Sequence, residues 1–268
     1  MEKSKEIRKR GLSSDGARAV RQQGHDDALE FAKAIGMDND YSNDKSAKKD
    51  VIDLCGDAHS VKSGHKKWQI FLYGLNRFSG DHGFVALNGM GEMLANCIKS
   101  FPETYSEYCL EKTAAKEKCK IPMRELCEKL QEKKRVKAFF HKSMFNGGEV
   151  NYLTVKQDGK FHIFLNEDVI NCFGENFAVH NSKAKTSKQF DDQKVIFKYQ
   201  NNNVAELEMR NDSEVHYREV RFNMYKPRAL KMLLEKITES KAYNDKVIVY
   251  GAAIKKFHKN SLLSYLRV

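Results

Sequence analysis

The sequence is poor in proline and has no long apolar run. Of its three prolines, Pro102 and Pro122 predict breaks in a charged helical region from about Gly91 to Lys142. No apolar stretch approaches the ~20 residues that a helix needs to cross a membrane. The first ten residues, MEKSKEIRKR, are charged throughout and do not resemble a secretory signal. We therefore expect a cytoplasmic protein without a membrane span.

Metal and nucleotide motifs are also missing. The six cysteines form no Cys-x-x-Cys pair, which argues against a zinc ribbon and predicts free thiols in a reducing compartment. The nine histidines form no His-Glu-x-x-His motif and no HNH-type arrangement. The Asn-Gly-Met-Gly stretch at 88–91 is too short for a phosphate loop, so we expect no nucleotide cofactor.

Positive charge is in clear excess. The chain has 47 Lys and Arg against 36 Asp and Glu, a formal net charge of +11. A basic surface favours a polyanionic partner, because each phosphate that it neutralises releases condensed counterions. The hydrophobic fraction of 41% is sufficient to build a core, so the chain is expected to be globular and to bind nucleic acid.

Helical and strand patterns are both present, which predicts an α+β fold. A helix is expected from about Asp26 to Ile35, because its first turn is acidic and Gly36 suits its end. Short β-rich runs at 50–55 and 58–62, separated by a glycine-containing turn, predict a hairpin.

The second half of the sequence favours strands. A further hairpin is expected around Asp158 and Gly159, and Pro227 suits the first turn of a helix that follows several strands. We therefore expect an N-terminal catalytic part at 1–145 and a β-rich C-terminal part for DNA recognition at 146–268, or one compact domain.

The first hairpin carries residues suited to phosphodiester hydrolysis. That reaction needs a metal ion held by oxygen ligands, and a cation near the nucleophile and the developing charge. Asp50 and Asp53 lie on the first predicted strand, and Ser60 and Lys62 share one face of the second. A two-residue turn would put Asp53 on that face, whereas a three-residue loop would put Asp50 there.

The hairpin resembles the active site of the PD-(D/E)xK nuclease superfamily. That pattern is an acid, a gap, and then acid-x-Lys on the neighbouring strand, here Asp50 followed by Ser60-Val61-Lys62. Lys49 replaces the usual Pro, and Ser60 stands where the second acid belongs. The string SVKSGHKKWQIFLYG is similar to the active-site region of several type II restriction enzymes.

This resemblance implies a type II restriction endonuclease that cuts double-stranded DNA with Mg²⁺. It implies a mixed central sheet flanked by helices, and a homodimer with one site for each strand. Two alternatives remain open. One is a repair or junction nuclease of the same superfamily, and the other is a non-catalytic DNA-binding module with a degenerate nuclease fold.

The same resemblance adds two candidate residues. Many members of the superfamily carry an upstream helix glutamate, and Glu30 in GHDDALEFAKAIG matches that context, so Glu30 is predicted to hold the metal together with Asp50. Gln69 matches the Gln of a Gln-x-x-x-Tyr element and is predicted to contact nucleic acid or orient the site. The simpler alternatives are a solvated Glu, paired with Lys33, and an ordinary buried aromatic segment.

DNA reading is predicted further along the chain, where the segment VAELEMRNDSEVHYREVRFNMYKPRALKMLL resembles a C-terminal segment of some restriction enzymes. Arg side chains suit guanine and Asn suits adenine in the major groove. The alternative is a solvated polar face of an outer sheet. The candidates are Arg210, Asn211, His216, Arg218 and Arg221.

Overall fold

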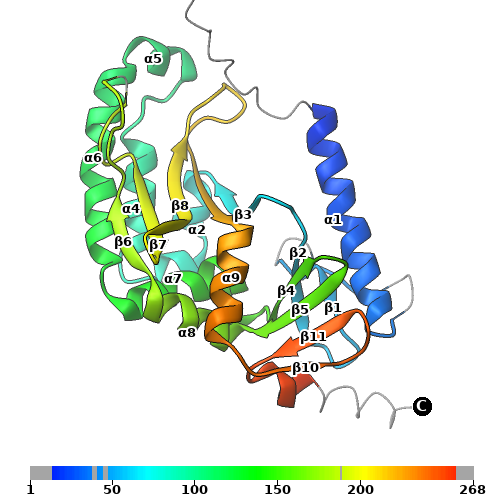
Figure 1. The fold of residues 1–268 in the computed structure, drawn as a ribbon. Helices are drawn as coiled ribbons and strands as arrows, with labels where there is room; N and C mark the ends of the chain where they lie inside the picture. Colours follow the sequence, from blue (N-terminus) through cyan, green and yellow to red (C-terminus); the bar gives the residue numbers. More distant parts are fainter. Residues whose placement is uncertain (1–13, 38–40, 45–47, 188, 258–268) are drawn as a thin grey trace, which may run out of the picture.

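Two β-sheets organise the chain, and helices fill the space beside them (Figure 1). The computed structural model describes residues 14–37, 41–44, 48–187 and 189–257. The fold is α+β, as predicted. Each sheet takes strands from both sides of residue 145, so the expected boundary between the two parts does not separate the sheets.

The first sheet has six strands and is mixed, since the pairs β2–β4 and β11–β5 are parallel and the others are antiparallel. Its order is β1 (Val51–Ile52), β2 (Ala58–Lys62), β4 (Tyr152–Gln157), β5 (Lys160–Leu165), β11 (Val247–Tyr250) and β10 (Ser240–Ala242). The predicted hairpins at 50–62 and around Asp158 are both present in it, as β1–β2 and β4–β5.

The second sheet has five strands and is antiparallel throughout. Its order is β3 (Lys67–Tyr73), β9 (Glu219–Tyr225), β8 (Asn202–Arg210), β7 (Lys194–Tyr199) and β6 (Ala178–Asn181). Only the short loop at 63–66 separates β2 in the first sheet from β3 in the second, so the predicted active-site hairpin leads directly into the other sheet.

Helix α1 (Ser14–Ala34) lies along one side of the six-stranded sheet, away from the other helices (Figure 1). It begins well before Asp26, and side-chain hydrogen bonds between residues four apart, such as Gln22 to Asp26, support the added turns. Phe31 packs on Phe161 and joins a small core beneath α1.

The remaining helices belong mostly to a larger core between the two sheets. Phe139 and Phe140 pack against Phe197 and Phe222 of the five-stranded sheet. These helices are α2 (Leu75–Gly80), α3 (His82–Val85), α4 (Met90–Lys99), α5 (Tyr105–Leu110), α6 (Lys112–Lys129), α7 (Lys133–Phe145), the 3₁₀ turn η1 (Asn146–Gly148), α8 (Asn166–Asn176) and α9 (Lys226–Lys236).

The prolines behave in two ways. Pro102 lies between α4 and α5 and Pro227 lies in the first turn of α9, as predicted. Pro122, in contrast, does not break a helix, because it lies inside α6. The buried neighbours Met123 and Leu126 anchor this part of α6 in the core, and that packing outweighs the backbone hydrogen bond that proline removes.

No helix among the described residues combines the length and apolar character that a membrane crossing requires.

Candidate functional site

The β1–β2 register decides which acid faces Lys62. Val51 pairs with His59, and the amide of Asp50 donates to the His59 carbonyl oxygen at 2.9 Å. Five residues, 53–57, form the loop. This odd-length loop has the same effect as the three-residue loop considered above: Asp50 lies opposite Ser60, and both side chains point to one face of the sheet.

The side chains of Asp50, Ser60 and Lys62 form one contact group. Ser60 Oγ donates to Asp50 Oδ2 at 3.3 Å, and Lys62 Nζ donates to Ser60 Oγ at 2.7 Å. Lys62 Nζ also lies 3.7 Å from Asp50 Oδ2, and the Val61 amide donates to the same oxygen at 2.8 Å. Ser60 is buried, whereas the other two side chains are partly open to solvent. The serine thus links the acid to the cation.

Asp53 has a different position. Its Oδ1 accepts hydrogen bonds from the amides of Cys55 and Asp57, each at 2.9 Å, and so holds the turn. Its Oδ2 lies 3.5 Å from Nε2 of the buried His59. The structure therefore places Asp53 in the turn rather than beside Lys62, and its predicted catalytic role is not kept.

Glu30 lies on the other face of the six-stranded sheet. Phe31 of α1 packs on His59, with ring centroids 4.9 Å apart, and the residues that flank His59 on β2 face away from α1. The Glu30 carboxylate accepts a 2.6 Å hydrogen bond from Lys156 Nζ. The structure does not bring Glu30 to Asp50, and its predicted role as a second metal ligand is not kept.

Lys48 lies within electrostatic range of Asp50 and Lys62, although the sequence patterns did not suggest it. Its Nζ donates to the carbonyl oxygens of Ile70, at 3.0 Å, and of Ser143, so it ties the start of the hairpin to β3 and α7. Burial, together with the charges of Lys62 and other cations, lowers the pKa of Lys48 to about 7. The only sequence signal was its place two residues before Asp50.

Two further cations act on Lys48 from segments that are distant in the sequence. The charges of Arg77 and Lys142 both contribute to its lowered pKa. Both cations contact Asp81, at 3.1 and 2.9 Å. Burial raises the pKa of the Asp81 carboxyl, but hydrogen bonds from Lys142 and the Gly83 amide outweigh it and leave the pKa below its ordinary value. These three side chains line a cleft of about 650 Å³.

The Asp50 group offers a single carboxylate to a metal. Within the described residues, no group of three or more His, Cys, Asp or Glu side chains could hold a metal ion. Mg²⁺ can be held by one or two carboxylates together with substrate phosphate and water. Asp50 is partly exposed at the start of the edge strand, so it fits a Mg²⁺ ion that shares its remaining ligands with the substrate.

Gln69 and the predicted DNA-reading residues lie in or beside the five-stranded sheet. Gln69 is exposed on β3, where it pairs with Asn223 of β9. Arg210 and Arg221 lie on β8 and β9, and the other DNA-reading candidates lie in the loop between these strands.

Each basic candidate in this region has an acidic partner. Arg210 contacts Asp212 at 2.9 Å, His216 contacts Glu219 at 3.1 Å, Arg218 contacts Glu103, and Arg221 contacts Glu208 at 2.6 Å. Asn211 accepts a hydrogen bond from the backbone amide of Arg218 at 3.0 Å. These side chains are therefore engaged within the molecule.

Comparison with known proteins gives no match to a family model, to a curated protein or to a solved structure.

Proposed function

We propose that this chain is a Mg²⁺-dependent DNA endonuclease whose reaction takes place at Asp50, Ser60 and Lys62. The observation that carries the proposal is the contact of Lys62 Nζ with both Ser60 Oγ, at 2.7 Å, and Asp50 Oδ2, at 3.7 Å. An acid and a lysine on adjacent strands, with the acid partly exposed, are the elements that phosphodiester hydrolysis requires.

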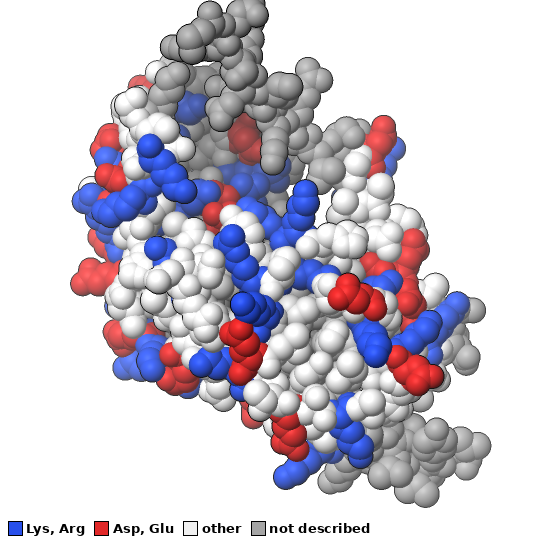
Figure 2. All heavy atoms as spheres, viewed as in Figure 1, with Lys and Arg blue, Asp and Glu red and all other residues white. Residues whose placement is uncertain are grey.

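The surrounding charge supports a phosphate substrate. Lys62 contacts Asp50, and the charges of Asp50 and Lys62 both act on Lys48. Arg77 and Lys142 also act on Lys48, although both are paired with Asp81. Clustered cations raise the local concentration of a polyanion. They also stabilise the negative charge of the pentacoordinate transition state of phosphodiester hydrolysis. Figure 2 shows that Lys and Arg also gather across the middle of one face, over α9 and between α9 and α1.

In this mechanism each residue has a defined task. Asp50 would hold Mg²⁺ together with the scissile phosphate, and the ion would act there as a Lewis acid. The Lys62 ammonium would orient the attacking water and offset the charge that develops on the phosphate. Ser60, which is buried between them, fixes the position of the Lys62 nitrogen.

The finer identity belongs to the same proposal. The mixed six-stranded sheet, with α1 on one face and the larger core on the other, supports a core like that of the restriction endonucleases. Sequence-specific cutting of double-stranded DNA by a homodimer would place one such site on each strand. A second candidate function is a DNA-binding module that does not cut, and the single carboxylate at the site is the observation in its favour.

Digestion of a long defined DNA separates these possibilities. The wild-type protein is incubated with the DNA in Mg²⁺ or in EDTA, and the fragment ends are sequenced. Discrete ends that appear only with Mg²⁺ support a restriction endonuclease, and nicking confined to branched DNA supports a junction nuclease. Retardation of the DNA without any cutting, in Mg²⁺ and in Mn²⁺, would leave the binding module. Lys241→Ala is the control for variants of the proposed site. Lys241 is exposed on β10, the edge strand at the opposite end of the sheet from β1.

A further inference from the structure

A basic pocket of about 680 Å³ lies between α6, the segment after β6 and the five-stranded sheet. We call it the lysine pocket. Five lysines and two aromatic rings line it, and Glu206 is its acidic residue. Its charged and aromatic lining consists of Lys116, Lys183, Lys185, Lys194, Lys198, Phe190, Tyr225 and Glu206.

Glu206 does not cancel the charge of the other lining lysines, because Lys67 and Lys194 already engage it. Its Oε1 lies 2.6 Å from Lys67 Nζ and accepts a hydrogen bond from Tyr225 at 3.1 Å, and its Oε2 lies 3.3 Å from Lys194 Nζ. Hydrogen bonding to Lys67 and the charges of both lysines outweigh burial and lower the pKa of Glu206. Glu206 is therefore ionised and neutralised.

The other four lysines of the lining keep their charge available to a ligand. Among the residues that the structure describes, none of Lys116, Lys183, Lys185 and Lys198 forms an ion pair with an acid. Burial lowers the pKa of Lys116, and the charge of Lys112 adds to this effect, so an anion in the pocket would relieve a repulsion that is already present. The pocket is therefore suited to an anion with more than one negative charge.

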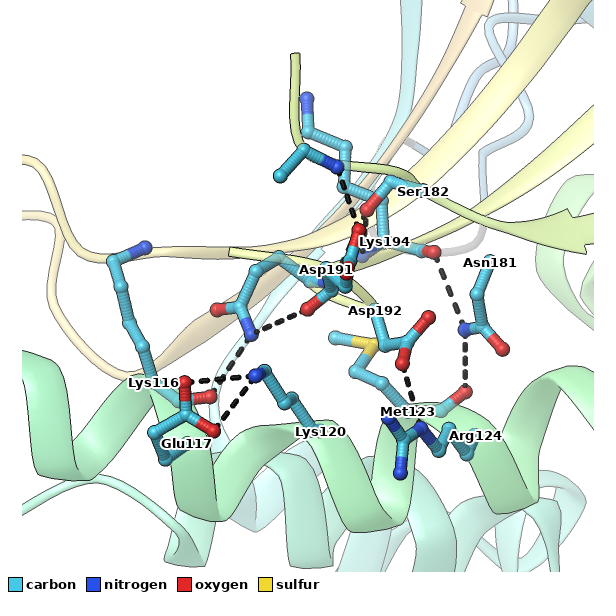
Figure 3. A network of polar contacts seen from close by, with 12 residues as sticks. Lys116, Glu117, Lys120, Met123, Arg124, Asn181, Ser182, Asp191, Asp192 and Lys194 are labelled. Atoms are coloured by element: carbon cyan, nitrogen blue, oxygen red, sulfur yellow. Dashed lines mark hydrogen bonds and ion pairs between the residues drawn. The ribbon is translucent and has the colours of Figure 1, made fainter. Parts of the chain in front are cut away.

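The pocket wall is held in place before any ligand binds (Figure 3). Arg124 of α6 pairs with Asp192 at 2.6 Å, and Asn181 donates to the carbonyl oxygen of Met123 at 3.1 Å. The Ser182 hydroxyl accepts the backbone amide of Lys194 at 3.2 Å. These bonds fasten the two ends of the segment between β6 and β7 to α6 and β7, so the ends need not become ordered on binding.

Phe190 gives the pocket an aromatic surface beside its cations. The ring is half-buried, and the ammonium nitrogens of Lys116 and Lys120 each lie 5.9 Å from its centroid. Sites for single-stranded nucleic acid combine lysines that contact the phosphates of the nucleic acid with an aromatic ring on which a base can stack. Inorganic anions need no such ring.

The pocket is close to the proposed cleavage site along the chain. Lys67, which contacts Glu206 of the lining, follows Lys62 by five residues, a distance of at most about 18 Å even for a fully extended chain. The short loop at 63–66 therefore links the two places along the chain.

We propose that the lysine pocket binds a single-stranded segment of the nucleic acid, with phosphates on its lysines and one base against Phe190. The inference rests on the proposed function for the identity of the polyanion. It concerns binding alone, and its test needs no cleavage.

The test is the binding of fluorescein-labelled oligo(dT) to the full chain in EDTA, followed by anisotropy at several salt concentrations. Lys183→Glu combined with Lys185→Glu should weaken binding by about tenfold or more, and should reduce the salt slope by roughly 1.4, since each lost phosphate contact removes about 0.7. The control combines Lys118→Glu, on the opposite side of α6 from Lys116, with Lys134→Glu, and should change binding far less. If both double variants lost the same affinity for oligo(dT), the assignment of the lysine pocket as the binding site would be wrong.

Phe190 tests the base contact separately. Phe190→Leu should weaken oligo(dT) binding by about tenfold, while Phe190→Trp should restore it, because stacking requires a ring. Polyphosphate, which has charge but no bases, should bind Phe190→Leu as well as it binds the wild type. An unchanged oligo(dT) affinity in Phe190→Leu would overturn the base contact. Oligo(dT) binding by a wild-type protein that never cuts DNA would support the pocket and refute the nuclease.

Discussion

Two clusters of basic side chains in this molecule differ in how their charge is used. Around Asp50, the cations Lys48, Lys62, Arg77 and Lys142 outnumber the acids, and Lys48 has a lowered pKa partly for that reason. Where β8 ends and β9 begins, each predicted DNA-reading arginine already contacts an acid, and Glu208 is shared by Arg221 and Lys194. We call these the Asp50 cluster and the arginine cluster. Both clusters look basic in the sequence, but in the structure only the Asp50 cluster has more cations than acids.

The comparison shows what a basic segment can and cannot do for a phosphate ligand. An arginine that is paired within the fold must leave its acid before it can reach DNA, and the gain on binding is reduced by that loss. A lysine that is held near other cations gains from any anion that approaches. We therefore expect chemistry and backbone contacts at the Asp50 cluster, and smaller energetic effects at the arginine cluster.

The largest effect is expected from the acid of the Asp50 cluster. Asp50→Asn should reduce cleavage by about 10²-fold or more, because it removes the charge that would hold Mg²⁺. Asp53→Asn should cut normally and lose at most about 1 kcal/mol of stability, since its amide can still accept bonds in the turn. Single-turnover cleavage and urea unfolding of both variants measure this difference. An inactive Asp53→Asn beside an active Asp50→Asn would contradict the assignment.

A smaller effect is expected from the serine that links acid and lysine. Ser60→Ala should slow cleavage roughly tenfold, because Lys62 keeps its charge but loses the group that fixes its position. Glu30→Gln should cut at the wild-type rate, as Glu30 pairs with Lys156 on the other face of the sheet. Cleavage rates in Mg²⁺ and Mn²⁺ compare the two. Loss of activity in Glu30→Gln alone would restore the predicted role of that residue.

The arginine cluster should respond weakly. A bidentate base contact would be worth about 1–3 kcal/mol. Because Arg218 and Arg221 are already bound to Glu103 and Glu208, we expect Arg218→Ala and Arg221→Ala to weaken cognate binding by less than about tenfold. Titration of labelled cognate DNA in Ca²⁺ provides the measurement. A larger loss confined to the cognate sequence would show that these arginines exchange their acids for bases.

The last predicted change concerns stability rather than cleavage or binding, and it is expected at Lys48. Its pKa falls from an ordinary 10.5 to about 7 in the folded protein, so between these values the unfolded chain binds more protons. The free energy of unfolding should therefore rise with pH through this window. Lys48→Met removes the titration, and any stability advantage that it has at pH 6 should shrink by pH 9. Parallel stability curves for variant and wild type would mean that Lys48 is not buried beside other cations.

Local patterns predicted the α+β class, two hairpins and the shared face of Ser60 and Lys62. The β-rich runs in 50–62 and the turn signal at Asp158 were sufficient for two hairpins. The loop length, which decides whether Asp50 or Asp53 faces Lys62, could not be read from the sequence. The contacts of Glu30 and Lys48 depend on which sheet face a helix covers and which segments meet between sheets. The spacing of residues along the sequence does not reveal such contacts between distant segments. The lysine pocket could not be predicted for the same reason, because its lysines come from α6, from β7 and from the segment before β7.

The most direct test of the central claim is a time course of supercoiled plasmid cleavage in Mg²⁺ by wild type, Lys62→Ala and Lys241→Ala. Both substitutions remove one lysine from the same sheet, but only Lys62 contacts Ser60 and Asp50. We predict that wild type and Lys241→Ala cut alike, while Lys62→Ala binds the plasmid and is slower by about 10²-fold or more. Cleavage by Lys62→Ala at the wild-type rate would contradict the account.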